Sequence, residues 1–395
     1  MTQGCGNQKI ENHQSIMRRN RIKVAVGLSG GVDSSVAAAL LKEKEYDVVG
    51  ITMEIFDGHE AAKQSERHAC YGPGEKEDIE AAASVCKKLC IPFHVIDLRK
   101  EYRNYVIDYF RKEYLAGKTP NPCVVCNHRL KFGFLLEKAR EAGVDFEFFA
   151  TGHYAQIIKS RRRFLLKKAL YLLKDQSYFL YALTQGQLSR TLFPIGIYTK
   201  QKVREMAKSI GLETADRPES QDFITDAGYS SLFSKEEVKE GDIVDEKGNI
   251  LGKHQGIIYY TVGQRRGLGI ASDRPLYVVE IDSKNNSIVV GDRDKIFSPG
   301  LIMGNLNLIA TEKLDRPHKI KAKIRLKHKE AEATVFPHEN DKAIVVFDEP
   351  QVSVAPGQSA VLYSDDTVFG GGVIEQALRP HQVSRIMMKN HLGVQ

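Results

Sequence analysis

The sequence predicts an α/β fold, with a parallel-sheet domain followed by a β-rich second half. Short apolar strands alternate with amphipathic helices between residues 21 and 215, and short strands with glycine-containing turns follow. Because parallel strands need crossover helices that cover both faces of the sheet, the first pattern is typical of an α/β domain. Many short strands at even spacing indicate a small β domain or barrel.

The first half contains four predicted strands and five predicted helices. The strands are expected at residues 22–27, 47–53, 92–98 and 146–151. The helices are expected at residues 33–44, 77–90, 101–115, 127–142 and 200–210. Glycine and proline punctuate residues 58–76 and 117–126, which are therefore expected to be loops.

The second half is predicted as two β units. Strands are expected at 241–244, 248–251, 256–262, 277–281 and 287–290, and then at 319–326, 333–336, 342–347 and 359–363. We therefore expect five segments: a tail at 1–20, an α/β domain at 21–215, a small mainly β central domain at 216–290, a C-terminal β-barrel at 291–380, and a basic tail of unknown order at 381–395.

The composition narrows the class of partner. The 395 residues include 57 Lys and Arg against 50 Asp and Glu, a net charge of +7 that suits a polyanion without requiring one. No stretch approaches the ~20 apolar residues that cross a bilayer, and the first 20 residues do not resemble a signal peptide. We therefore expect a cytoplasmic protein without a membrane partner. In that reducing compartment, its six cysteines indicate metal binding or catalysis more than disulfides.

A glycine-rich segment directly after the first strand predicts an anion site. It reads Ser-Gly-Gly-Val-Asp-Ser-Ser from Ser29 to Ser35. Gly30 and Gly31 let backbone N–H groups approach an oxyanion, and the following helix directs its positive end there. Asp33 is a candidate ligand for a Mg²⁺ that bridges phosphates. The Gly-x-x-x-x-Gly-Lys-[Ser/Thr] phosphate loop is absent from the sequence.

The segment resembles the loop of the PP-loop, or N-type, ATP pyrophosphatases. Further stretches appear in the order of one family in this group: Gly117–Asn127, Lys131-Phe132, Ala150–Tyr154, Lys174–Leu180, Tyr260–Ile270, Pro356–Gln358 and Gly370–Ile374. Over residues 21–376 the chain resembles the tRNA-specific 2-thiouridylases. The resemblance implies that ATP activates the 2-oxygen of the wobble uridine in tRNAs for Lys, Glu and Gln. Sulfur from a donor protein or sulfide then replaces it, releasing AMP and pyrophosphate, and the enzyme is expected to be a monomer.

The resemblance also implies roles for individual residues. ATP would contact Gly27, Leu28, Ser29, Gly30, Gly31, Val32, Asp33, Ser34, Met53 and Gly152. The tRNA would contact Asn121, Pro122, Cys123, Lys174, Asp175, Gln176 and Arg325, with Asn121 on the flipped uridine. Cys126 would be the catalytic thiol. Leu326 stands where the family keeps a tyrosine, which weakens the expectation for the neighbouring Arg325.

Two departures from the family concern the sulfur chemistry. Cys123 replaces the usual aspartate, and Ile224 stands where a second catalytic cysteine is usual. Three interpretations remain open. Cys123 and Cys126 form the persulfide and resolving pair at a helix start that lowers the thiol pKa. Alternatively, Cys70, Cys123 and Cys126 hold a 4Fe–4S cluster, or the pair binds Zn²⁺ with His128 or Cys70. Cys86 and Cys90 are expected in the core.

Two other functions are compatible with parts of the sequence. A PP-loop ligase acting on a small molecule explains the glycine-rich segment, but not Cys123, Cys126 or the β-rich half. A non-catalytic tRNA-binding paralogue explains the loss of a cysteine at Ile224, but not the intact segment from Ser29 to Ser34.

Overall fold

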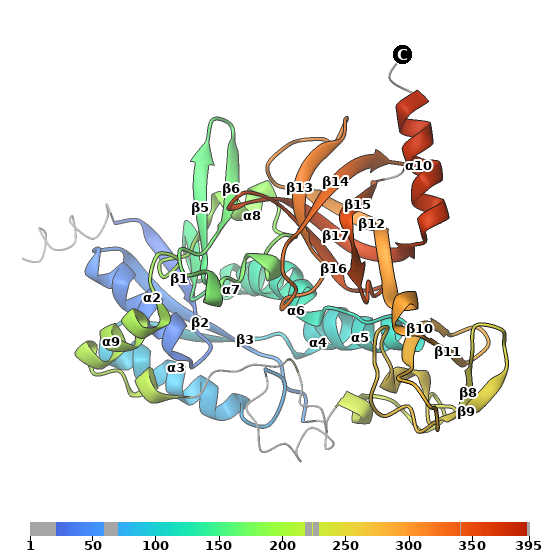
Figure 1. The fold of residues 1–395 in the computed structure, drawn as a ribbon. Coiled ribbons are helices and arrows are strands. Elements are labelled where there is room, and N and C mark those ends of the chain that lie inside the picture. The colour runs from blue at the N-terminus through green and yellow to red at the C-terminus, as the bar shows by residue number, and fades with distance from the viewer. Residues whose placement is uncertain (1–20, 59–69, 218–222, 224–228, 340, 393–395) are drawn as a thin grey trace, which may run out of the picture.

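The computed structural model describes residues 21–58, 70–217, 223, 229–339 and 341–392. Two interpretations fall outside these residues, namely the tail at 1–20 and the position of Ile224. Figure 1 places the α/β domain on one side, with the C-terminal barrel and the smaller central β unit on the other.

The α/β domain is built on a five-stranded parallel sheet of order β3-β2-β1-β4-β7. The strands are β1 Lys23–Gly27, β2 Asp47–Glu54, β3 Phe93–Asp97, β4 Phe148–Thr151 and β7 Thr191–Leu192. Alternate residues of β1 enter different clusters: Val24 and Val26 face one layer of helices, and Ala25 the other. All three side chains are fully buried, as expected for a central parallel strand.

Helices cover both faces of the sheet. One layer contains α2 Val32–Glu43, α3 Glu75–Leu89 and α9 Lys200–Ile210. The other contains α4 Arg99–Tyr102, α5 Asp108–Leu115, α6 Pro122–Val125 and α7 Leu135–Glu141. π-Helical segments, Arg103–Ile107 and Cys126–Phe134, join α4 to α5 and α6 to α7. The short helix α8 Gln185–Ser189 precedes β7. The predicted α/β fold class is confirmed.

The central unit has a four-stranded sheet of order β10-β11-β8-β9. Its strands are β8 Gly241–Val244, β9 Ile250–His254, β10 Tyr277–Asp282 and β11 Ser287–Gly291. The predicted strand at 256–262 is wrong: residues Ile257–Tyr259 form a 3-10 turn after Gly256, whose φ is 144°. That φ favours glycine and turns the chain out of the sheet.

The C-terminal strands form a closed barrel, because β12 pairs with both β15 and β17. Its strands are β12 Phe297–Leu308, β13 His318–Lys323, β14 Ala331–His338, β15 Lys342–Val352, β16 Ser359–Ser364 and β17 Thr367–Leu378. The sheet continues from β17 into a hairpin of the α/β half, β5 Ala155–Ser160 and β6 Arg163–Lys168. Figure 1 shows this hairpin standing beside the barrel. Neither strand was predicted.

One further expectation about the second half is made more specific by the structure. The part of the 381–395 tail that the structure describes belongs to a helix, α10 Pro380–Leu392, which packs on the barrel through Val383, Ile386 and Met387. The three glycines at 370–372 lie inside β17, where side chains would collide: a Cβ on Gly372 would lie 2.6 Å from the carbonyl oxygen of Gly304. Close approach of neighbouring strands thus explains this run of glycines. Within the described ranges, no helix has the length and apolar character needed to span a bilayer.

Candidate active site

The glycine-rich segment forms a tight loop between β1 and α2. The backbone N–H of Ser29 donates to Ser34 Oγ at 3.2 Å, and Ser35 Oγ donates to the carbonyl of Gly31 at 2.8 Å. Gly30 has φ 69°, and a Cβ there would lie 2.5 Å from the carbonyl oxygen of Asp78. Only glycine fits this position, so the loop keeps a backbone shape that suits an oxyanion.

The predicted ATP residues meet at one edge of the sheet. Gly27 is the register partner of Ile51 in β2 and of Thr151 in β4. Met53 and Gly152 therefore follow at the carboxyl ends of the two strands that flank β1. A Cβ on Gly152 would lie 2.5 Å from the backbone nitrogen of Ser34, so the loop after β4 presses on the start of α2. Ligands of open α/β sheets bind along this edge.

The carboxylate of Asp33, a predicted Mg²⁺ ligand, is already occupied by hydrogen-bond donors. Lys200 Nζ donates to both carboxylate oxygens of Asp33, at 2.9 and 2.7 Å, and the Tyr154 hydroxyl donates to one at 2.9 Å. A cation on this carboxylate would have to displace Lys200. The arrangement does not fit Asp33 as a metal ligand; it fits a residue that ties α2 to α9 and to the loop after β4.

Cys123 and Cys126 lie in the first turns of a helix that begins five residues before its predicted start. Asn121 caps this helix: its side-chain oxygen accepts from the backbone N–H of Val124 at 3.4 Å. Pro122 occupies the first helical position, where its missing N–H costs nothing. The loop predicted at 117–126 therefore ends at Asn121, and both thiols are carried by a rigid element.

The predicted thiols share one environment. Cys126, Cys70 and Cys123 all act electrostatically on the phenol of buried Tyr102 and on the half-buried Lys131. Tyr102 stacks on Tyr71 at 5.4 Å, in the core beneath the loop after β2. The structure thus brings together three cysteines from two segments that are about fifty residues apart in the chain.

The electrostatics of Cys126 contradict the expectation of an acidic thiol. Burial raises its pKa to about 11, although the charge of Lys131 opposes the rise. Cys126 lies one turn inside the helix and packs against the main hydrophobic core. The loss of hydration on burial therefore raises the thiol pKa by more than the helix dipole lowers it. Burial acts in the opposite direction on Lys131 and lowers its pKa, but the charges of Cys126, Cys70 and Cys123 together outweigh burial, so the pKa of Lys131 is raised. Lys131 is a cation available to stabilise an anionic sulfur.

Sequence reasoning quoted Lys131 and His153 within motifs but gave them no role. In an α-helix, residues five apart do not share a face, whereas the wider π-helical turn of Cys126–Phe134 brings Lys131 back toward Cys126. Burial and then Lys131 lower the pKa of His153 to about 3, so its imidazole is neutral near pH 7. Its Nδ1 lies 2.7 Å from Thr151 Oγ1. The positions of Lys131 and His153 within the family motifs were a signal that both could have a role. The sequence does not predict the π-helix that brings Lys131 toward Cys126.

The predicted tRNA residues divide into two kinds. Asp175 accepts from the backbone of Ala169 at 2.9 Å and from the Ser177 hydroxyl at 2.8 Å. Gln176 accepts from the backbone of Tyr154 at 2.9 Å. These two side chains hold their own turn, while Lys174 is partly exposed beside them. Arg325 lies just after β13; burial raises the pKa of Tyr178, and the charge of Arg325 is near enough to oppose that rise.

The loop before the cysteine helix is held by both β units. Thr119 donates its backbone N–H to Pro356 at 2.8 Å, and its hydroxyl lies 2.5 Å from the Thr261 hydroxyl. Gln358 Nε2 donates to the carbonyls of Thr119 and Pro120, at 3.1 Å each. We call these five residues the joint. Two stretches that the sequence analysis noted without a role, around Thr261 and around Gln358, therefore meet at the loop that carries the thiols.

The described cysteines do not form a recognisable metal site. In the ranges that the structure describes, no three His, Cys, Asp or Glu side chains gather in a group able to hold a metal ion. Cys86 is buried, as expected, and burial raises its pKa to about 12. Cys90 is exposed at the end of α3, which corrects its placement in the core.

The fold and the site define a nucleotide-binding α/β domain with an attached β domain and barrel. Three family descriptions match in this order: "tRNA methyl transferase HUP domain" over residues 22–225, "tRNA methyl transferase PRC-barrel domain" over 232–292 and "Aminomethyltransferase beta-barrel domain" over 298–374. A protein named tRNA-specific 2-thiouridylase MnmA in Acetivibrio thermocellus is 49% identical over 361 residues, 89% of this chain and 99% of the relative. The chain belongs to the tRNA-specific 2-thiouridylase family.

A second relative agrees in both extent and identity. The protein of the same name in Clostridioides difficile is 47% identical over 363 residues, 90% of this chain and 99% of that one. A solved 4-thiouridine synthetase–RNA complex with bound ATP covers 52% of this chain and 45% of its own at 17% identity, with a TM-score of 0.32. That likeness is too low to add to the family assignment.

Proposed function

We propose that this chain replaces the 2-oxygen of the wobble uridine in tRNA with sulfur, at the expense of ATP. The observation that carries the proposal is the 49% identity across 99% of a relative named tRNA-specific 2-thiouridylase. The nucleotide loop and the cysteine helix, both in the same α/β domain, are the machinery that such a reaction requires. A small-molecule ligase would have no use for the two β units that hold the joint.

In the first step, the uridine 2-oxygen attacks the α-phosphorus of ATP and pyrophosphate leaves. The bond formed is O2–P, and the bond broken joins the α- and β-phosphates. A urea-like oxygen is a poor leaving group, and adenylation makes it a good one. Backbone N–H groups from Leu28 to Gly31 and the start of α2 would stabilise the departing pyrophosphate. Met53 would contact the adenine, and Gly152 would close on the nucleotide from the end of β4.

In the second step, a persulfide on Cys126 attacks C2, and AMP leaves with the former 2-oxygen. The Cys123 thiol then attacks the Cys126 sulfur, releasing the 2-thio group and leaving a Cys123–Cys126 disulfide. With a donor protein, an external thiol first reduces this disulfide, and the donor's persulfide then transfers its outer sulfur to the Cys126 thiol and is left as a thiol. With sulfide, the sulfide attacks the Cys126 sulfur of the disulfide, which regenerates the Cys126 persulfide and releases the Cys123 thiol. Lys131 would stabilise the anionic sulfur, whose formation at Cys126 burial otherwise disfavours.

The tRNA would approach between the α/β domain and the barrel. Arg325 and Lys174 flank the turn that Asp175 and Gln176 hold in place. Asn121 would meet the flipped base beside the thiols, with Pro122 shaping the helix start. Selection of Lys, Glu and Gln anticodons, a monomeric state and a cytoplasmic site of action remain predictions. The domain limits at residues 215 and 290 also remain predictions, and the family matches that end at residues 225 and 292 support them.

The predictions of Mg²⁺ and of a 4Fe–4S cluster concern different residues. Mg²⁺ is expected to enter with ATP on its phosphates, since Asp33 is engaged by Lys200. The convergence of Cys70, Cys123 and Cys126 on Lys131 supports a 4Fe–4S cluster, but their arrangement does not fit a ligand set. We therefore favour the thiol pair. Anaerobic purification of the protein and its Cys70→Ala variant tests this choice: four irons per chain, lost in the variant, would establish the cluster.

The experiment that tests the function supplies purified protein with unmodified tRNA, ATP and a persulfide donor. Nucleosides from digested tRNA are then separated and weighed. We expect 2-thiouridine at the wobble position, AMP in equal amount, and neither product without ATP. Bound tRNA without AMP would instead identify a non-catalytic paralogue, and AMP formation with a small amine in place of tRNA would identify a ligase.

A further inference from the structure

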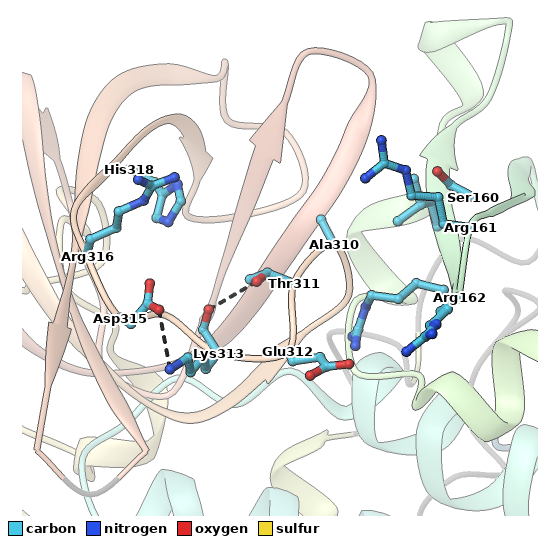
Figure 2. Close-up of a pocket in the computed structure, with 12 residues that line it drawn as sticks. Ser160, Arg161, Arg162, Ala310, Thr311, Glu312, Lys313, Asp315, Arg316 and His318 are labelled. Carbon is cyan, nitrogen blue, oxygen red and sulfur yellow. Dashed lines mark hydrogen bonds and ion pairs between the residues drawn. The ribbon is translucent and has the colours of Figure 1, made fainter.

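A groove separates the β5–β6 hairpin from the barrel, away from the nucleotide edge. Figure 2 shows the arginines of the hairpin tip on one side and the loop from Ala310 to Asp315 on the other. Its volume is about 940 Å³. None of its lining residues belongs to the nucleotide loop, the cysteine helix or the joint.

The groove is strongly basic. Five of its twelve lining residues are Arg or Lys, and two are acidic. Lys313 lies 3.4 Å from Asp315, which neutralises one of the five. Among the residues that the structure describes, Arg161, Arg162 and Arg316 form no ion pair, and all three are exposed. Their charges are therefore directed at solvent and at whatever enters the groove.

The walls of the groove are fixed to each other. Arg163 donates to the carbonyls of Ile309 and Leu308, at 2.9 and 3.0 Å. Gln185 donates to the carbonyls of Phe164 and Ile309, at 3.0 and 3.3 Å. These bonds tie the hairpin of the α/β half to the loop after β12. The cations at the tip consequently stand at a set spacing opposite those of the barrel.

The turn at the hairpin tip gives Arg161 a conformation that its residue type does not favour. Ser160 pairs with Arg163, so the two arginines form a two-residue hairpin loop. Arg161 has φ 50°, in the left-handed region where such loops prefer Gly or Asn. A sequence selected only for a stable turn would differ here. The tip therefore carries two guanidinium groups, one of them at a position whose φ favours another residue type.

We propose that this groove binds the phosphate backbone of the tRNA outside the anticodon loop. The proposal rests on the proposed function and deepens it, by assigning a second contact surface to the same substrate. β5 begins three residues after Gly152 and reaches the tip after roughly 15–20 Å, at ~3.3 Å per residue. With a base held at the nucleotide edge, this distance places the groove beside the stem that carries the base. Guanidinium groups at fixed spacing suit phosphate oxygens and carry no sequence preference.

The test replaces Arg161 by Gly and Arg162 by Ser, residues that favour this two-residue turn, so the hairpin keeps its fold. A Lys202→Gln and Lys208→Gln variant loses the same two charges from α9, on the other side of the α/β domain. Binding of unmodified tRNA is titrated at several salt concentrations, and thiolation is measured over a range of tRNA concentrations.

We expect the hairpin variant to bind tRNA about tenfold more weakly at low salt. The slope of log affinity against log salt should fall by between about one and two, because about two phosphate contacts are lost. KM for tRNA rises by a similar factor while kcat changes less than twofold, and the α9 variant behaves as the wild type. If the hairpin variant keeps its tRNA affinity and salt dependence, or if the α9 variant loses as much affinity, the proposal that the groove binds tRNA is wrong. A wild type that binds tRNA without thiolating it would contradict the proposed function, while the binding data still decide on the groove.

Discussion

The joint and the groove, two of the regions where the barrel meets the α/β domain, differ in kind. At the joint, Thr119 and Pro120 are held by Pro356 and Gln358 through direct hydrogen bonds. At the groove, the barrel loop and the hairpin tip face each other across open, charged space. A Cβ on Gly357 would lie 2.8 Å from the carbonyl oxygen of Thr119, so the joint has no room for a side chain there.

The difference teaches how one scaffold can separate positioning from affinity. Hydrogen bonds are short-ranged and directional, so the joint determines where the cysteine helix stands. Charges act over a Debye length of about 8 Å at physiological salt and tolerate variation in their partner, so the groove suits a long polyanion. We therefore expect changes at the joint to lower the rate of sulfur transfer, and changes at the groove to lower affinity for tRNA.

The largest effect is expected from removing the thiol that the joint positions. Cys126→Ser should lower 2-thiouridine formation by at least ~10³-fold, because the sulfur carrier is lost. Pyrophosphate release with bound tRNA should persist within about threefold, since the nucleotide loop is untouched. Single-turnover measurements of both products check this. Equal loss of both would mean that Cys126 acts in adenylation, and retained thiolation would mean that another sulfur carries the reaction.

A large effect should also follow from loosening the joint itself. Gln358→Leu leaves the carbonyls of Thr119 and Pro120 without their side-chain donor. A shift of the helix start by a fraction of an ångström should reduce sulfur transfer by about 10- to 100-fold. Binding of tRNA should change less than twofold. Gln376→Leu, on an exposed position of β17, is the matched control. A Gln358→Leu variant with a normal kcat and a raised KM for tRNA would show that the joint acts on tRNA affinity. That result would contradict the proposed division of roles between the joint and the groove.

An intermediate effect is expected from the cation beside the thiols. Because Lys131 lowers the pKa of Cys126 against the effect of burial, Lys131→Met should raise that pKa above about 11. The thiolate fraction at pH 9 then falls, and alkylation of Cys126 by iodoacetamide should slow by about tenfold. Lys131→Arg should restore most of the rate. Mass spectrometry of the Cys126 peptide between pH 7 and 10 measures both, and a rate that Lys131→Met leaves unchanged would remove Lys131 from this role.

The smallest effect tests whether the two regions are independent. The variant that combines Gln358→Leu with Arg161→Gly and Arg162→Ser should show the product of the separate effects on kcat/KM, within about twofold. Distant sites without shared partners usually contribute additively in free energy. A double-mutant cycle on kcat/KM for thiolation measures the coupling between the joint and the groove. A coupling much larger than twofold would indicate that tRNA in the groove acts on the cysteine helix through the barrel.

Much of the α/β half was predictable because its signals are local. Helix α9 was predicted with its observed bounds, and β1, α2 and β2 within one residue at either end. The β5–β6 hairpin was missed because its two-residue turn contains arginines in place of Gly or Asn. The helix start at Asn121 was hidden by the prolines at 120 and 122, which also serve in loops. Strand β17 was missed where glycines make room for neighbouring strands.

By itself, the sequence determined the order of the domains, the nucleotide loop and the candidate thiols, since each depends on residue types at short spacing. Only the tertiary structure decided the state and surroundings of those thiols. Burial in the core sets the pKa of Cys126, and the π-helical turn brings Lys131 beside it. The joint and the groove likewise join segments more than one hundred residues apart. Such contacts arise from packing of whole domains, which no local pattern of residues records.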